Sequence, residues 1–63
     1  MTIYFSSEID VTITFDNYFD MKMIGTFDEI LDRIRWAFLE YGFDGAVVVS
    51  NETGEVVAEI DND

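Results

Sequence analysis

Residues 9–23 read IDVTITFDNYFDMKM, and apolar and polar side chains alternate along most of this stretch. Every second residue from Ile9 to Phe15 is apolar, and the residues between them are Asp or Thr. The same alternation resumes at Phe19 and continues to Met23. A period of two is typical of strands that bury one face. The stretch therefore predicts two such strands joined by a loop at residues 16–18.

The length of this loop fixes how the two strands pair. With residues 16–18 as the loop, Phe15 lies opposite Phe19 and Val11 lies opposite Met23. All the apolar side chains then share one face, whereas a slip of one residue would bury charged side chains.

A second loop, at residues 6–8, would pair an N-terminal strand with the strand that begins at Ile9. Phe5 then lies opposite Ile9, and Ile3 lies opposite Val11. Residues 2–25 are therefore predicted to form a three-stranded antiparallel meander.

The next segment carries the signals of one helix. Thr26 and Glu29 are spaced as a capping box, and Gly42 supplies a stop. At about 100° per residue, one face of this helix is apolar. Its members are Phe27, Ile30, Leu31, Ile34, Ala37, Phe38 and Tyr41.

Residues 46–50 and 55–61 are predicted to form a hairpin around Asn51-Glu52-Thr53-Gly54, with the glycine in the left-handed conformation. The expected register puts Val47 opposite Ala58, with Val49 opposite Val56. The complete prediction is an α+β fold with a five-stranded antiparallel sheet, in the order βββαββ, and one helix packed across one face. Residues 1–63 are expected to form a single compact domain.

The composition is dominated by acids. Fourteen Asp and Glu residues against three Lys and Arg give a formal charge of −11 on 63 residues, which exceeds what solubility requires of a small domain. Disordered acidic tails have few apolar residues, whereas this chain is 49% hydrophobic and 16% aromatic. We therefore expect a folded, anionic body that avoids direct contact with nucleic acid and with anionic membranes.

Few residue types suited to catalysis are present. The chain has no His and no Cys, and its single lysine, Lys22, lies on the predicted solvent face of a strand. We expect no enzyme activity, no cofactor and no metal centre. Calcium sites at residues 16–20 or 61–63 are alternatives, but neither has the spacing of an EF-hand loop.

The acids are expected to gather in two rows. Residues two apart on a strand lie about 6.7 Å apart on one side, which is comparable to the spacing of successive phosphates in nucleic acid. The row on the last strand and its turn consists of Glu52, Glu55, Glu59 and Asp61. The row on the outer face of the helix consists of Asp28, Glu29, Asp32 and Glu40. An ordinary solvated face remains the alternative for both.

Trp36 is predicted to lie among the helix acids, on the side opposite Tyr41, with Leu39 beside it. A tryptophan and a leucine ringed by acids are typical of the centre and rim of a protein interface. Contact with a partner, self-association, and packing over the chain's own sheet edge remain open. Val48 and Val57 are expected to pair on the sheet face away from the helix, as a weaker apolar patch.

In size, acidity and simple α+β build, the whole chain resembles small acidic inhibitors that phages and plasmids make against nucleic-acid enzymes. These include anti-CRISPR proteins, those of type I most closely, and anti-restriction DNA mimics. No diagnostic motif supports the resemblance, so no residue role is carried over from it.

The resemblance implies a non-catalytic inhibitor that occupies a basic nucleic-acid-binding surface by mimicry. Its expected contact residues are the two acidic rows with Trp36 and Leu39. The N-terminus lacks the basic region of a signal peptide, and no apolar run is long enough for a membrane span. The expected location is therefore the cytoplasm, that of the host cell if a phage encodes the protein. The alternative is a small homodimeric or accessory module whose acidity serves solubility.

Overall fold

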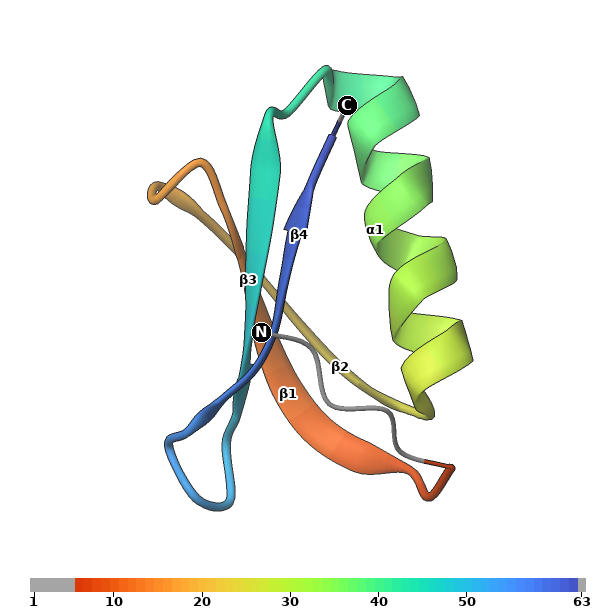
Figure 1. Ribbon diagram of the computed structural model, residues 1–63, viewed down its shortest axis with the longest axis vertical. Coiled ribbons are helices and arrows are strands. Elements are labelled where there is room, and N and C mark those ends of the chain that lie inside the picture. Colours follow the sequence, from red (N-terminus) through yellow and green to blue (C-terminus); the bar gives the residue numbers. More distant parts are fainter. Residues whose placement is uncertain (1–5, 63) are drawn as a thin grey trace.

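The computed structural model describes residues 6–62, which form four strands and one helix. In chain order these are β1 (Ile9–Phe15), β2 (Phe19–Gly25), α1 (Phe27–Tyr41), β3 (Gly45–Ser50) and β4 (Val56–Asp61). The strands form one antiparallel sheet in the order β2-β1-β3-β4. The sheet is twisted, and α1 lies along one of its faces (Figure 1). The α+β architecture therefore has two layers.

The prediction of five strands is wrong, because the sheet that residues 6–62 form has four. The first predicted strand, at residues 2–5, lies outside the described residues. The side of β1 on which this N-terminal strand was predicted to pair is taken by β3. Ser50 of β3 lies opposite Val11 on that side, and Met23 of β2 lies opposite Val11 on the other. The β1–β3 pairing joins segments on either side of the helix, so the local alternation that predicted the meander could not reveal it.

The β1–β2 hairpin has the predicted register, with Phe15 opposite Phe19 and Val11 opposite Met23. Its turn closes with a hydrogen bond of 3.1 Å from the Tyr18 N–H to the Phe15 carbonyl. Asp16 and Asn17 have positive φ angles of 51° and 63°. Asp and Asn tolerate this left-handed conformation better than other residues with a side chain do, which explains why the turn falls at these two positions.

Helix α1 begins and ends as predicted. The Thr26 hydroxyl accepts the Glu29 N–H at 3.3 Å, and the Glu29 carboxylate accepts the Thr26 N–H at 2.8 Å. At the other end, Gly42 has a φ of 71° and donates its N–H to the Phe38 carbonyl at 2.9 Å. The predicted apolar face is buried at Ile30, Ile34, Ala37 and Phe38. Tyr41, which was predicted to belong to that face, is 58% exposed.

The core lies between α1 and the inner face of the sheet. β1 supplies its centre, where Val11, Ile13 and Phe15 are fully buried. Phe43, in the loop after α1, stacks on Phe15 with ring centroids 4.8 Å apart. The remaining buried apolar residues are Ile30, Ile34, Ala37, Phe38, Ala46, Val48 and Ala58.

The predicted register of the second hairpin is wrong beyond its first pair. Val49 lies opposite Val56 as expected, but a β-bulge follows, and Ala58 lies opposite Val48 rather than Val47. Val48 therefore faces the core at 1% exposure, and the expected outer pair of Val48 with Val57 does not form. Residues 46–49 are all small and apolar, so no alternation specifies which of them faces inward. Pairing with β1 decides the face, because Val48 lies opposite the buried Ile13.

Candidate partner-binding surfaces

Nearly all the acidic side chains of the described residues are exposed to solvent. Of those in residues 6–62, only Asp10 and Asp16 are half-buried, and all the others are exposed. The ion pair between described residues joins the Arg35 Nη1 and Asp32 Oδ1 atoms at 3.9 Å, and both side chains are largely exposed. An exposed pair of this kind contributes little to stability. The fold therefore leaves the excess negative charge on the surface.

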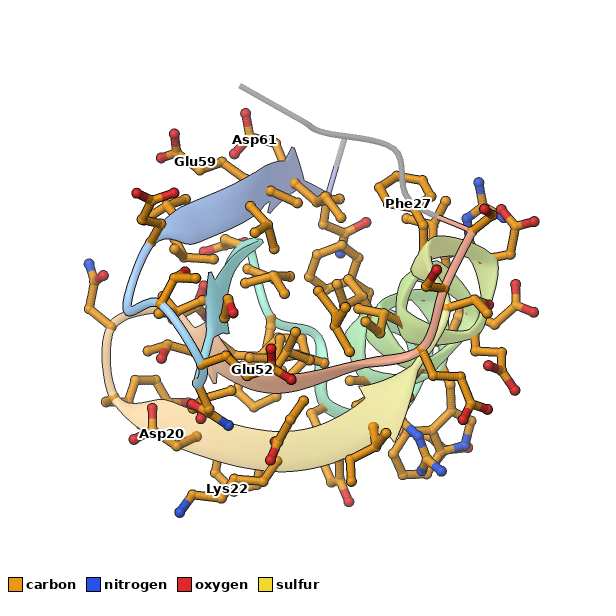
Figure 2. All side chains as sticks on the ribbon, turned by 90° about the horizontal axis from the view of Figure 1, so that it is seen from below. Asp20, Lys22, Phe27, Glu52, Glu59 and Asp61 are labelled. Atoms are coloured by element: carbon orange, nitrogen blue, oxygen red, sulfur yellow. The ribbon has the colours of Figure 1, made fainter. Side chains whose placement is uncertain are left out.

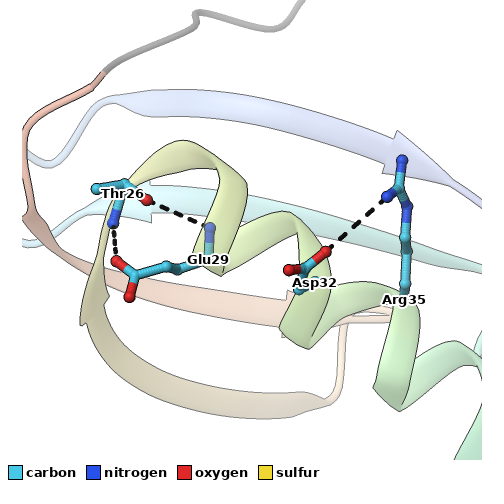
Figure 3. A network of polar contacts seen from close by, with 4 residues as sticks. All are labelled: Thr26, Glu29, Asp32 and Arg35. Carbon is cyan, nitrogen blue, oxygen red and sulfur yellow. Dashed lines mark hydrogen bonds and ion pairs between the residues drawn. The ribbon is translucent and has the colours of Figure 1, made fainter.

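The acids of the predicted helix row do lie on the exposed side of α1. Asp28, Asp32 and Glu40 are exposed. Glu29 is also exposed, but one of its carboxylate oxygens is committed to the capping box (Figure 3). An acidic side chain in the first turn of a helix also interacts favourably with the helix dipole. The row is therefore a set of acids at fixed backbone positions along one helix.

The acids of the predicted strand row are not all on one face. Glu59 and Asp61 lie opposite Val47 and Gly45, so they share the outer face of the sheet. Glu55 precedes β4, and its carbonyl accepts the N–H of Ser50, whose own side chain is buried on the inner side. The β-bulge in the hairpin lies between Glu55 and these two acids, so Glu55 does not continue their row on the outer face. Glu52 lies in the turn, and Figure 2 shows Glu59 and Asp61 on β4 at the opposite edge of the sheet from Asp20 and Lys22 on β2.

Trp36 and Leu39 face different flanks of α1. Trp36 lines a recess of about 490 Å³ between α1 and β2. Leu39, which is 88% exposed, lines a separate recess of about 280 Å³ beside Asn62, the residue that follows β4. Trp36 and Leu39 therefore do not form the single apolar contact site that was predicted from the sequence. The prediction that Trp36 lies opposite Tyr41 is also wrong, because their rings meet edge to face with centroids 5.6 Å apart.

An aromatic surface that the sequence analysis did not predict continues from Trp36. We call Tyr18, Phe19, Trp36 and Tyr41 the aromatic strip. Their exposed fractions are 74%, 39%, 41% and 58%, respectively. The rings of Phe19 and Tyr41 are 6.2 Å apart. Tyr18 ends the first hairpin loop, Phe19 begins β2 and Tyr41 ends the helix, so a sequence signal existed in aromatic residues next to two chain reversals.

The buried Phe43 supports this strip from below. Its ring stacks on Phe19 with centroids 5.5 Å apart, and it contacts Tyr41 at 5.6 Å and Tyr18 at 6.0 Å. Phe43 is itself 6% exposed. The strip is therefore held by ring contacts to the core, and it is an exposed apolar surface of the kind that marks interaction sites.

Side chains of both candidate calcium sites form hydrogen bonds within the fold. The Asp16 carboxylate accepts the N–H groups of Asp44 and Gly45 at 2.9 to 3.2 Å. The Asn62 side chain donates to the Phe43 carbonyl at 2.9 Å, and Asp63 lies outside the described residues. Within residues 6–62, no three acids lie close enough together to hold a metal ion.

No helix in the described part of the chain is both long enough and apolar enough to cross a membrane. Comparisons of the chain with protein-family models, with curated proteins and with solved structures found no match.

Proposed function

We propose that the protein is a non-catalytic inhibitor that occupies a basic, nucleic-acid-binding surface on a DNA- or RNA-targeting enzyme. The observation that carries the proposal is the exposure of nearly every acid in residues 6–62 on a small folded body of charge −11. A surface that binds phosphates with Lys and Arg attracts such a body for the same reason that it attracts nucleic acid.

The fold supports this function because it holds the acids in place. Glu59 and Asp61 are on a strand, and Asp28, Asp32 and Glu40 are on a helix. Charges fixed on regular elements lose little conformational entropy when a partner binds, whereas a disordered acidic tail must be ordered first. Long-range attraction also accelerates the encounter with a basic partner.

A homodimeric or accessory module is the second candidate, and the exposed aromatic strip favours it. Stable dimers commonly bury exposed aromatic side chains. The charge opposes this candidate, because two bodies of charge −11 repel each other. A basic partner brings the opposite charge, so we favour inhibition of a nucleic-acid enzyme in the cytoplasm of the cell where that enzyme works.

A displacement experiment tests the proposal. Fluorescently labelled DNA is bound to a purified type I CRISPR complex and, in parallel, to a restriction enzyme, and the protein is then titrated in. We expect release of the DNA from at least one enzyme, measured as a fall in fluorescence anisotropy. Polyglutamate at the same charge concentration is the control, and it should displace less DNA because its charges are not fixed. DNA that stays bound to both enzymes, or equal displacement by polyglutamate, would contradict the proposal.

A further inference from the structure

The recess between α1 and β2 already holds a guanidinium group over an aromatic ring. The Arg33 Cζ atom lies 5.2 Å from the centroid of the Trp36 ring. Glu29 and Asp32 line the same recess, together with Met23 from β2. An indole face flanked by carboxylates is a favourable site for a cation, and tryptophan is the best of the aromatic residues for this purpose.

The aromatic strip extends this site along one flank of the molecule. From Trp36 the exposed rings run through Tyr41 and Phe19, and the contacts of Phe43 hold them from below. Aromatic side chains held in this way provide a large contact area at low entropic cost. Methionine adds an adaptable apolar surface, because Met21 and Met23 on the edge strand β2 are only partly buried.

Charge decides what such a surface accepts. The net charge of −11 repels nucleic acid and repels a second copy of this chain. A basic protein surface brings the complementary charge. Arginine suits the recess better than lysine does, because a planar guanidinium stacks on an indole ring and also pairs with carboxylates in two-point fashion.

We propose that the recess and the aromatic strip form the contact surface for a basic partner protein, and that an arginine side chain of that partner replaces Arg33 over the Trp36 ring. This inference rests on the proposed function and identifies where and how the partner docks. It differs from the prediction made from sequence, because it assigns no contact to Leu39 on the other flank of α1.

Trp36 provides the readout, because it is the single tryptophan of the chain. Oligoarginine and oligolysine peptides of equal length are titrated into the intact protein while the Trp36 emission and the binding isotherm are recorded. We expect oligoarginine to bind about two- to fivefold more tightly and to change the emission, as a cation over an exposed ring predicts. Equal affinity for the two peptides with no change in emission would overturn the inference.

Two arginines give a matched pair for the replacement step. Arg33→Ala and Arg35→Ala each remove one positive charge from α1, so both change the long-range attraction equally. Arg33 lies over the Trp36 ring, whereas Arg35 pairs with Asp32. We expect Arg33→Ala to tighten oligoarginine binding by about twofold relative to Arg35→Ala, because it vacates the ring. Identical effects of the two variants would show that no replacement occurs.

A second pair separates the two flanks of the helix. Trp36→Leu should abolish the preference for oligoarginine over oligolysine, and Leu39→Ala should leave that preference intact. Circular dichroism checks that both variants are folded. If Leu39→Ala removes the preference while Trp36→Leu keeps it, the other flank is the contact surface and the inference fails. Sedimentation giving a dimer that Tyr41→Ala dissociates would assign the strip to a second copy and overturn the inference as well.

These outcomes are distinguishable from failure of the proposed function. Displacement of DNA from an enzyme that is unchanged by Trp36→Leu would keep the function and overturn this surface. An intact arginine preference at Trp36 without displacement of DNA from any enzyme would keep the surface and contradict the function.

Discussion

Asp16 shows how an acid in a turn can join two loops of the fold. It has a left-handed backbone, and its carboxylate accepts the N–H groups of Asp44 and Gly45. These contacts join the β1–β2 loop to the loop between α1 and β3. No local pattern predicts these contacts, because the partners lie 28 and 29 positions away.

Replacing Asp16 should therefore destabilise the protein although it removes a repelling charge. We expect Asp16→Ala to lower the free energy of unfolding by about 1–3 kcal/mol, since two N–H groups lose their acceptor and alanine disfavours a positive φ. Asp16→Asn should lose less, because the amide keeps one acceptor oxygen and tolerates the backbone. Urea unfolding measures both, and Glu52→Ala, in an exposed turn, controls for the lost charge. Equal stability of Asp16→Ala and Glu52→Ala would contradict a structural role for this carboxylate.

Among the elements, the first hairpin and the helix were predictable, and so was the existence of the second hairpin, but its register beyond the pair of Val49 with Val56 was not. Strict alternation from Ile9 to Phe15 leaves only one face of β1 that can be buried. The capping residues Thr26 and Gly42 mark the two ends of α1. β3 has no alternation, so its inner face depends on distant pairing with β1 and on a bulge in the edge strand β4. Edge strands commonly carry such bulges, but nothing in the residues themselves positions this one.

The inner face of β3 can be tested with neighbouring valines. Val48 is buried against the core, whereas Val47 is half-buried on the outer face. Val48→Ala should cost about 2 kcal/mol of unfolding free energy, and Val47→Ala should cost less than about 1 kcal/mol. Both variants lose the same β-propensity, so the difference between their denaturation midpoints reports burial alone. A larger loss for Val47→Ala would restore the register predicted from the sequence.

The candidate surface was only partly predictable from the sequence, for the same reason: local patterns do not show which distant elements lie beside a residue. A helical wheel gives the direction of Trp36 around the helix axis, but it does not say that β2 flanks one side and the end of β4 the other. The recesses on the two flanks show which neighbours Trp36 and Leu39 have. The acids were easier to predict, because composition alone requires most of them to remain at the surface.

At the scale of the whole molecule, charge opposes folding. The formal charge is −11, and the ion pair between described residues is exposed. Salt screens repulsion between exposed charges, with a Debye length of about 8 Å at physiological ionic strength. We therefore expect the melting temperature, followed by circular dichroism, to rise as sodium chloride increases from low to physiological concentration. A melting temperature that stays constant or falls would mean that the charges are compensated locally.

Encounter with a basic partner should depend on the same charges. Glu59 and Asp61 lie on the outer face of the sheet, away from the aromatic strip that we assign to contact. Reversing both to lysine should slow association and leave dissociation nearly unchanged, because distant charges steer the encounter. Trp36→Leu should instead accelerate dissociation, as loss of a buried anchor does. Surface plasmon resonance on the enzyme that the protein displaces from DNA resolves both rates.

The salt dependence of that affinity tests most directly whether the protein binds where nucleic acid binds. Between about 50 and 200 mM sodium chloride, we expect the logarithm of the association constant to fall steeply and linearly with the logarithm of the salt concentration, as it does for phosphate-binding surfaces. The Glu59 and Asp61 reversals should make that slope shallower. An affinity that does not change with salt, and that is indifferent to these reversals, would contradict electrostatic mimicry of nucleic acid.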